Sequence, residues 1–385
     1  MNRTLEQIQP SLTLAITSRA KQLKAEGHSV CTFSAGEPDF DTPQSAKDAC
    51  VEAMLAGRTK YTPSAGDLAL REAICAKLRA ENGIDATPDR VIVSCGAKHS
   101  LANAFLALCN PGDEVVIPAP YWLSYPEMVR IAGGVPVFVS TTPETGLKIT
   151  AEQLEAAITP RTVAFVLNTP CNPTGAVYGE AELRALAEVC VRHGVYIIAD
   201  EIYERLVYDG ARHVSVAALG PEIAEQTLTV NGFSKAFAMT GWRMGYATGP
   251  REFIRAMTTV QSHTAGPPAT FAQCGGAFAL GRCGAEVRAM VRAFAERRDR
   301  IVALLRGIPG VSCVEPRGAF YVFPDISSFG LGSQEFARRL LDERHVALVP
   351  GIAFGSDANV RLSYACGMDE IEEGIRRIRD FCKDL

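Results

Sequence analysis

The sequence predicts an α/β protein: a mainly parallel β-sheet with helices on both faces, joined to a smaller α+β domain. From residue 90 onward, β-branched runs alternate with helical patterns, which is typical of a parallel sheet. Two of these runs, Thr162–Asn168 and Val195–Ala199, are almost continuously apolar, as strands buried on both faces should be. After about residue 290 an arginine-rich helical pattern precedes short strands, which indicates the second domain.

The N-terminal part of the chain reads as helices separated by loops. Helical patterns cover Thr13–Lys24, Ser45–Ala56 and Leu68–Asn82. Two loops rich in turn-forming residues, 34–40 and 60–66, lie between them. On their own, such loops indicate turns and say little about function.

Strands and helices alternate in the middle of the chain. The expected strands are Arg90–Cys95, Glu114–Ile117, Val135–Val139, Thr162–Asn168 and Val195–Ala199, with two more short strands flanking Lys235. Helical patterns run from Gly96 through Cys109, over Tyr121–Ala132, and through apolar positions 183, 186, 187, 190 and 191 as far as Gly194. Four small or polar residues come just after strands: Gly96, Asn168, Asp200 and Asn231. Since ligands bind at the carboxyl ends of parallel strands, we expect one site to collect them.

The last part of the chain has a different sequence pattern, with short expected strands between helices. A helical pattern, Val287–Arg306, leads into expected strands at Val311–Val314, Ala319–Phe323, Val346–Val349 and Val360–Ser363. Helices are expected over Gln334–Arg344 and from Asp369 onward. We therefore divide the chain into an N-terminal segment, 1–44, that joins the small domain, a large domain, 45–288, and a small C-terminal domain, 289–385.

The composition is that of a globular protein of two domains. The 385 residues are 47% hydrophobic and 21% charged, with a net charge of −4, so nothing indicates nucleic acid or a membrane surface as partner. The first ten residues are polar and do not resemble a signal peptide. The twelve cysteines are scattered and form no Cys-x-x-Cys pair, so we expect no metal site. Free thiols favour a cytoplasmic location.

The most informative stretch runs from Asn231 to Gly245. Lys235 lies between Ser234 and an Ala-Phe-Ala run, and a lysine in such surroundings loses hydration, which favours its neutral amine. A neutral amine is what a Schiff-base nucleophile requires. Arg243 follows eight residues later beside glycines, and it suits a phosphate or a carboxylate. For a lone lysine, a buried stem with an exposed head would be the more common situation.

The whole stretch resembles the pyridoxal-phosphate lysine motif of class I aminotransferases: Gly-Phe-Ser-Lys, then Ala-Met, then Gly-Trp-Arg-Met-Gly. The resemblance extends from Pro10-Ser11 to Ser363-Tyr364. It implies the type I fold of pyridoxal-phosphate-dependent transferases, with 45–288 as the cofactor-binding domain, and a homodimer with shared active sites. It also implies a ping-pong mechanism in which Lys235 binds the cofactor as a Schiff base and then moves the proton.

Three further residues gain roles from the resemblance. Asp200 ends a buried strand, where it is either an N-cap or, as in the family, the partner of the pyridine nitrogen. Tyr203 is either core packing or a partner of the ring's phenolic oxygen. Asn172 lies in the loop Asn168-Thr169-Pro170-Cys171-Asn172-Pro173-Thr174-Gly175 and resembles the asparagine that binds the same oxygen and faces the substrate.

The phosphate is expected at the start of a helix. Gly96-Ala97-Lys98 opens a helix after a strand, so its free N–H groups suit an anion. The resemblance adds Ser234, Arg243 and, from the partner subunit, Tyr61. Many relatives have a serine where this chain has Gly232, so one phosphate hydroxyl is missing here or is supplied by Ser234.

The substrate is expected to meet an arginine and an aromatic ring. Arg361 lies among apolar neighbours, and a buried arginine requires an anion, so the resemblance makes it the partner of the substrate α-carboxylate, together with the N–H group of Gly36. Trp122 is either a core aromatic or the residue that stacks on the cofactor and borders the substrate.

Substrate choice rests on Lys98 and Thr13. Because a helix N-terminus disfavours cations, a lysine at position 98 invites explanation by an anionic ligand. Both residues match positions that the bacterial and plant branch of aspartate aminotransferases uses for the distal carboxylate, which implies transfer from aspartate to 2-oxoglutarate (EC 2.6.1.1). The alternatives are a prephenate or aromatic aminotransferase, a C–S lyase or decarboxylase of the same fold, or a non-catalytic ligand-sensing module.

Overall fold

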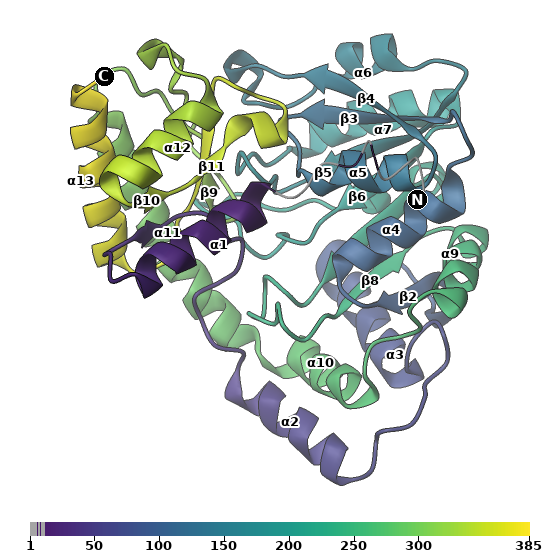
Figure 1. Cartoon of the computed structure of the whole chain (residues 1–385). Helices are drawn as coiled ribbons and strands as arrows, with labels where there is room; N and C mark the ends of the chain where they lie inside the picture. Colours follow the sequence, from purple (N-terminus) through teal and green to yellow (C-terminus); the bar gives the residue numbers. More distant parts are fainter. Residues whose placement is uncertain (1–5, 7, 9–11) are drawn as a thin grey trace.

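The computed structural model describes residues 6, 8 and 12–385. Within these residues, the main sheet has seven strands in the order β2-β8-β7-β6-β5-β3-β4 (Figure 1). Their bounds are β2 Val91–Ser94, β3 Glu114–Ala119, β4 Val135–Ser140, β5 Thr162–Asn168, β6 Tyr196–Asp200, β7 Thr227–Gly232 and β8 Gly245–Thr248. From β4 to β7 the neighbouring strands are parallel, and β8 is antiparallel to both of its neighbours. The sheet is therefore mainly parallel, as predicted.

Helices cover both faces of this sheet because successive strand residues point to opposite sides. In β3, Val115 and Ile117 belong to one buried cluster, whereas Val116 belongs to another. The first cluster includes residues of α4 (Ala97–Leu108), α5 (Ser124–Ile131) and α9 (Arg251–His263). The second includes residues of α6 (Ala151–Ala157), α7 (Glu180–His193) and α8 (Pro221–Glu225). Strands buried on both faces need apolar residues at every position, which explains the continuous runs in the sequence.

A third cluster covers the β2–β8 end of the sheet. It joins Val91 and Val93 to α2 (Gln44–Leu55), α3 (Leu68–Lys77) and α10 (Thr270–Arg282). A single π-helical turn, Leu78–Asn82, continues α3. In Figure 1, α2 and α10 lie together at the lower end of the molecule.

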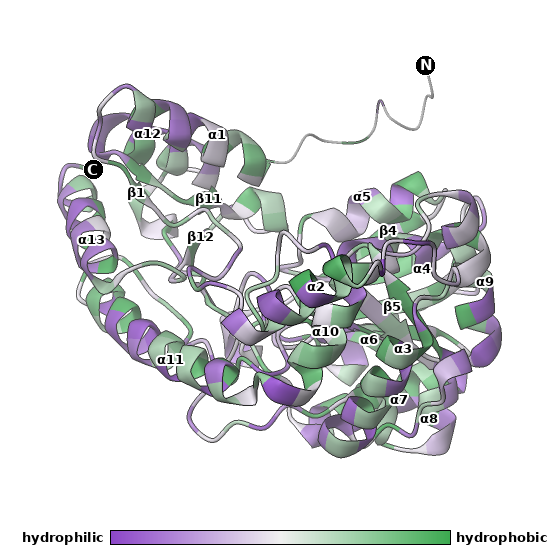
Figure 2. Ribbon diagram, turned by 90° about the horizontal axis from the view of Figure 1, so that it is seen from below, coloured by the Kyte–Doolittle hydropathy of each residue, from purple (hydrophilic) through white to green (hydrophobic). Residues whose placement is uncertain are grey.

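The remaining elements form a smaller unit, on the left of Figure 1. Its helices are α1 (Leu12–Ala25), α11 (Gly284–Arg306), α12 (Ser333–Arg344) and α13 (Met368–Lys383). Its strands are β1 (Cys31–Thr32), β9 (Tyr321–Val322), β10 (Val346–Ala347), β11 (Val349–Pro350) and β12 (Val360–Ser363). Figure 2 shows hydrophobic and hydrophilic residues alternating along α11 and α13, because each helix buries one face in this unit and exposes the other.

The structure corrects several local predictions. Val311–Val314 is not a strand, because only Ser312 makes a bridge, to Asp325. The helix expected from Tyr121 begins at Ser124, and Asn231 lies inside β7 instead of after it. Helices α6, α8, α9 and α10 were not predicted from the sequence.

The structure describes little of the N-terminal stretch, but the helices that it does describe can be compared with a membrane span. Apart from residues 6 and 8, the polar stretch 1–10 lies outside the described residues, and so do Pro10 and Ser11, where the resemblance begins. None of the described helices has both the length and the apolar composition needed to cross a bilayer.

Candidate active site

A cavity of about 570 Å³ brings together most of the residues that the sequence predicts for a site. Its lining includes Thr13, Gly36, Ala97, Lys98, Trp122, Asn172, Asp200, Tyr203, Ser234, Lys235, Arg243 and Arg361. Three predicted residues do not line it. Gly96 lies against Arg243, Asn231 is buried inside β7, and Tyr61 is fully exposed to solvent.

The parallel register of the sheet explains why these residues meet. Asn168 is paired with Asp200 across β5 and β6, and Asp200 is paired with Val230 of β7. The loops that carry Asn172 and Lys235 therefore begin at the same edge of the sheet, at the carboxyl ends of β5 and β7 on either side of β6.

Lys235 is a basic group of the cavity whose pKa is lowered. Its amine donates a hydrogen bond to the carbonyl oxygen of Gly36, and lies 5.9 Å from the ring centre of Tyr203. Burial lowers the pKa of Lys235 to about 8, although the carboxylate of Glu37 opposes this effect. Neutral amine is therefore available near physiological pH, as nucleophilic and proton-transfer chemistry require.

Asp200 is a buried carboxylate that is 4% exposed. The hydroxyl of Tyr125 donates to its Oδ2 at 2.6 Å, and the backbone N–H of Ile202 donates to its Oδ1 at 3.2 Å. Burial raises the pKa of Asp200 to about 6, even though both hydrogen bonds favour the ionised form. Such a carboxylate would gain much from a cationic partner.

Arg361 is a buried cation without a carboxylate partner among the described residues. Its Nη1 donates to Asn172 Oδ1 at 3.1 Å and its Nη2 to the carbonyl oxygen of Ser34 at 3.0 Å. Its Nε has no hydrogen-bond partner, and the guanidinium lies 4.5 Å from the ring centre of Tyr321. A guanidinium that is 2% exposed and only partly satisfied suits a small carboxylate ligand.

The start of α4 is built for close approach of an anion. Gly96 has φ 89°, and a Cβ there would lie 2.7 Å from Nη2 of Arg243. A Cβ on Gly245 would lie 2.2 Å from the backbone nitrogen of Ala97. Only glycine fits either position, so Arg243 and the first turn of the helix lie in contact. Free N–H groups of a helix start next to a guanidinium form a suitable phosphate site.

The glycine at position 232 is fixed by its neighbours. A Cβ there would lie 3.0 Å from Gly245 Cα and 3.1 Å from the side chain of Ile202. A serine would therefore require its neighbours to move. Ser234, which lines the cavity, is the hydroxyl of this stretch that remains available to an anion.

The other end of the cavity is more open. Lys98 is exposed, its ammonium lies 5.0 Å from the ring centre of Trp122, and partial burial together with Arg243 lowers its pKa. Helix α1 contributes Thr13 and Lys21 to the same lining. Thr13 Oγ1 is buried without a hydrogen-bond partner.

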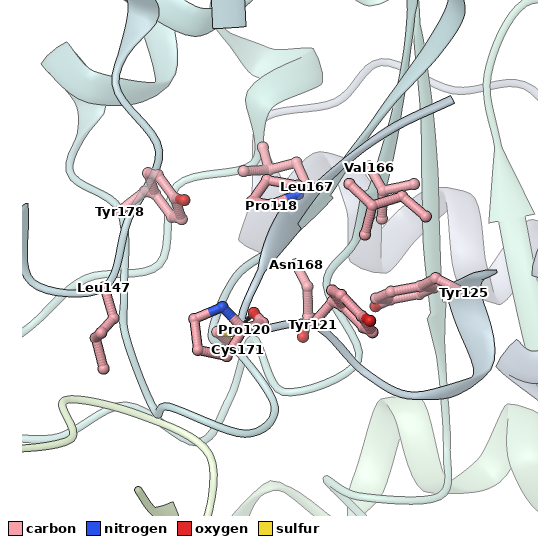
Figure 3. Close-up of a pocket in the computed structure, with 11 residues that line it drawn as sticks. Pro118, Pro120, Tyr121, Tyr125, Leu147, Val166, Leu167, Asn168, Cys171 and Tyr178 are labelled. Carbon is pink, nitrogen blue, oxygen red and sulfur yellow. Dashed lines mark hydrogen bonds between the residues drawn. The ribbon is translucent and has the colours of Figure 1, made fainter. Parts of the chain in front are cut away.

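A second, smaller cavity of about 20 Å³ is lined by Tyr125 and Asn168, which line both cavities (Figure 3). The amide of Asn168 donates to the carbonyl oxygen of Asp200 at 2.9 Å, and its Oδ1 accepts from the backbone of Asn172 at 2.8 Å. Cys171 also lines this cavity, and burial raises the pKa of its thiol. The thiol is therefore an inert packing group.

Several residues of the site were not predicted from the sequence. Tyr125, Glu37, Lys21 and Tyr321 all line the main cavity. Tyr125 gave no local signal that separates it from Tyr121, because its partner Asp200 lies 75 residues away in the chain.

A set of potential metal ligands lies outside this cavity. Among the described residues, Glu201, Glu204 and His213 have ligand atoms within 4.8 Å of one another. These carboxylates already have partners, because Lys77 donates to Glu204 and Ser215 donates to Glu201 at 2.6 Å.

The residues of the main cavity fit pyridoxal phosphate. The start of α4 with Arg243 suits its phosphate, Lys235 has the lowered pKa that an aldehyde-binding amine needs, and Asp200 is a buried anion suited to the pyridine nitrogen. Arg361, with its unpartnered Nε, is left for a substrate carboxylate.

Comparisons with known proteins agree with this arrangement. The family "Aminotransferase class I and II" matches residues 28–378. The chain is 51% identical to an aspartate aminotransferase of Geobacillus stearothermophilus over 97% of this chain and 96% of that protein. It is 49% identical to an aspartate/prephenate aminotransferase of Cereibacter sphaeroides over 100% and 99%.

Solved structures give the same result. An aspartate aminotransferase of Rhizobium meliloti superposes with a TM-score of 0.96 at 44% identity, covering 100% of this chain and 98% of that one. One from Thermus thermophilus, solved with maleate, has a TM-score of 0.95 at 45% identity, covering 99% of each chain. The chain therefore belongs to the class I and II aminotransferases, and is a pyridoxal-phosphate-dependent enzyme with the type I fold.

Proposed function

We propose that this enzyme transfers the amino group of aspartate, or of a similar dicarboxylic amino acid, to 2-oxoglutarate by a ping-pong mechanism. The observation that carries the proposal is the presence of two cations, Arg361 and Lys98, that line one cavity and have no carboxylate partner among the described residues. A substrate with two carboxylates would satisfy both. The names of the relatives support the same substrate class.

The proposed roles at the cofactor follow from the contacts of each residue. Bound pyridoxal phosphate supplies an electron sink for the reaction. Lys235 takes the proton from the substrate carbon and returns it, which its pKa of about 8 supports. Asp200, oriented by Tyr125, faces the pyridine nitrogen. Tyr203 and Asn172 hold the phenolic oxygen, and Trp122 stacks on the ring.

The proposed roles at the two anionic ends use the remaining residues. Gly96, Ala97, Ser234 and Arg243 bind the phosphate, with Lys98 beside them. Arg361 and the N–H group of Gly36 bind the α-carboxylate, and Asn172, which accepts from Arg361 at 3.1 Å, orients the guanidinium. Lys98 and Thr13 bind the distal carboxylate.

We also propose that the enzyme is a homodimer in which Tyr61 reaches the phosphate of the partner subunit. Tyr61 is fully exposed, which is unusual for an aromatic residue without a partner surface. The neighbouring helix α2 exposes Val51, Met54 and Leu55. An apolar strip beside an exposed tyrosine supports an interface there.

We infer the domain division 1–44, 45–288 and 289–385 on similar grounds. The pairing of β1 with β10, and the packing of Phe33 in the core of the smaller unit, support joining the N-terminal segment to the C-terminal domain.

The twelve free cysteines support a cytoplasmic location.

One assay distinguishes the candidate reactions. The purified enzyme is given aspartate with 2-oxoglutarate, beside glutamate and prephenate as alternative partners, and kcat/KM is measured for each. We expect the highest value with aspartate and 2-oxoglutarate. Prephenate is the second candidate, because several relatives are named for it. A higher value with prephenate would replace our choice, and binding without turnover would indicate a ligand sensor.

A further inference from the structure

The loop between β7 and β8 has an unusual backbone. It carries Lys235 near one end and Arg243 near the other. Two of its residues with side chains, Ala238 (φ 50°) and Arg243 (φ 53°), adopt the left-handed conformation. Residues other than glycine keep this conformation only where surrounding contacts hold them. The neighbours of this loop therefore determine the position of Arg243.

Residues 36–42, here called the strap, provide these contacts. Gly36 accepts a hydrogen bond from Lys235. Thr42 Oγ1 donates to the carbonyl oxygen of Ala238 at 2.8 Å and accepts from Trp242 Nε1 at 3.1 Å. The strap is thus bonded to one of the two left-handed residues and to the neighbour of the other.

The strap is also fixed to the smaller unit. Asp39 accepts two hydrogen bonds from Arg297 of α11, at 2.7 and 2.9 Å. The guanidinium of Arg297 lies 5.2 Å from the ring centre of Phe40. The middle of the strap therefore depends on α11, while Gly36 and Thr42 at its two ends bond to the loop that carries Lys235 and Arg243.

Glu37 makes the contact that leads most directly to Arg243. The hydroxyl of Thr240 donates to Glu37 Oε2 at 2.8 Å, and the carbonyl oxygen of Thr240 accepts from Arg243 Nη1 at 2.8 Å. Thr240 is therefore held by the carboxylate on one side and holds the guanidinium on the other. We propose that Glu37 is a positioning residue, which fixes Arg243 through Thr240 and adds a negative charge beside Lys235.

This role rests on the proposed function, because it assigns the phosphate to Arg243. The charge of Glu37 is one of several charges that surround the amine of Lys235. The ionisable groups around Lys235 come from several elements: Asp200 at the end of β6, Tyr203 after it, Arg243 of its own loop, Arg361 of β12 and Glu37 of the strap. Burial lowers the pKa of Lys235, and Glu37 opposes the effect.

The test separates the hydrogen bond from the charge. The full-length protein is freed of cofactor and titrated with pyridoxal phosphate, and the dissociation constant is measured by absorbance for Glu37→Ala, Glu37→Gln and Thr240→Val. We expect Glu37→Ala and Thr240→Val to weaken binding about 3- to 10-fold, the effect of one lost hydrogen bond. Glu37→Gln keeps an acceptor and should weaken it less. Asp41→Asn removes an exposed charge from the same strap and serves as the matched control.

A pH titration of the cofactor absorbance in each reconstituted protein gives a readout that a merely structural role would not move. Because a negative charge favours the protonated nitrogen of Lys235, its loss in Glu37→Gln should shift the titration to lower pH. Thr240→Val keeps the charge and should not shift it. Wild-type affinity in Glu37→Ala, or an unmoved titration in Glu37→Gln, would overturn the proposal. These readouts need no turnover, so a failure of the proposed substrate assignment would be seen separately.

Discussion

Two lysines of this enzyme that are withdrawn from solvent, Lys77 almost fully and Lys235 partly, have opposite surroundings. Lys77 of α3 donates to Glu204 and, at 2.8 Å, to Asn82 Oδ1, in a network outside the main cavity. Burial alone would lower the pKa of Lys77, but Tyr246 and Glu204 outweigh it and raise the pKa. Lys235 has only a carbonyl oxygen as its hydrogen-bond partner among the described residues, and its pKa falls to about 8.

The difference separates a lysine that holds the structure from one that performs chemistry. A paired ammonium keeps its proton and ties α3 to the loop after β6. An amine that is withdrawn from water and has no carboxylate bonded to it releases its proton near neutral pH and remains available for reaction. Burial by itself therefore does not identify a catalytic lysine, whereas burial without a carboxylate partner is informative.

The strongest test of this contrast is Lys235→Ala. Since no other group in the cavity has the same position and a lowered pKa, we expect kcat to fall by about 10⁴-fold or more, the upper range for a lost acid–base group. The circular dichroism spectrum and the elution volume in gel filtration should match those of the wild type. Normal steady-state turnover in this variant would contradict the role of Lys235.

Lys77→Met should lower the stability of the fold, whereas Lys235→Ala should lower turnover. Removing one partner of a buried ion pair leaves Glu204 uncompensated, which costs about 3–5 kcal/mol in the free energy of unfolding. The measurement is urea-induced unfolding. The double variant Lys77→Met/Glu204→Gln is the control, because it removes both charges, and it should recover much of the loss. If Lys77→Met unfolds at the wild-type urea concentration, Lys77 does not hold the structure.

The sequence predicted the role of Lys235 but not the difference between Lys235 and Lys77, because the two depend on contacts of different range. The motif around Lys235 is local, and so were the apolar runs that predicted the main strands. The partners that distinguish the two lysines are distant in the chain. Glu204 lies 127 residues from Lys77, and Glu37 lies 203 residues from Thr240.

Predictions from local sequence patterns were wrong or incomplete where tertiary contacts determine the backbone conformation. Val311–Val314 is apolar enough for a strand, yet the neighbouring backbone offers Ser312 only a single bridge. Ala238 and Arg243 carry no sequence signal for a left-handed backbone, which the strap imposes through contacts far apart in the chain. Motifs thus identified the reacting groups, while the residues that position them required the fold.

Lys98 is neither a structural lysine like Lys77 nor the reacting lysine Lys235. Of the three substitutions, its replacement should have the smallest effect. It is exposed and contacts Trp122, so the fold does not depend on it. Lys98→Ala should lower kcat/KM for aspartate by about 10- to 100-fold, the worth of one charge-assisted hydrogen bond. Phenylalanine and other monocarboxylic amino acids should lose little, because they have no distal carboxylate. Lys24→Ala, which removes an exposed lysine of α1 that does not line the cavity, is the control. If Lys98→Ala impairs both kinds of substrate equally, Lys98 serves the cofactor and the protein's substrate choice must come from other residues.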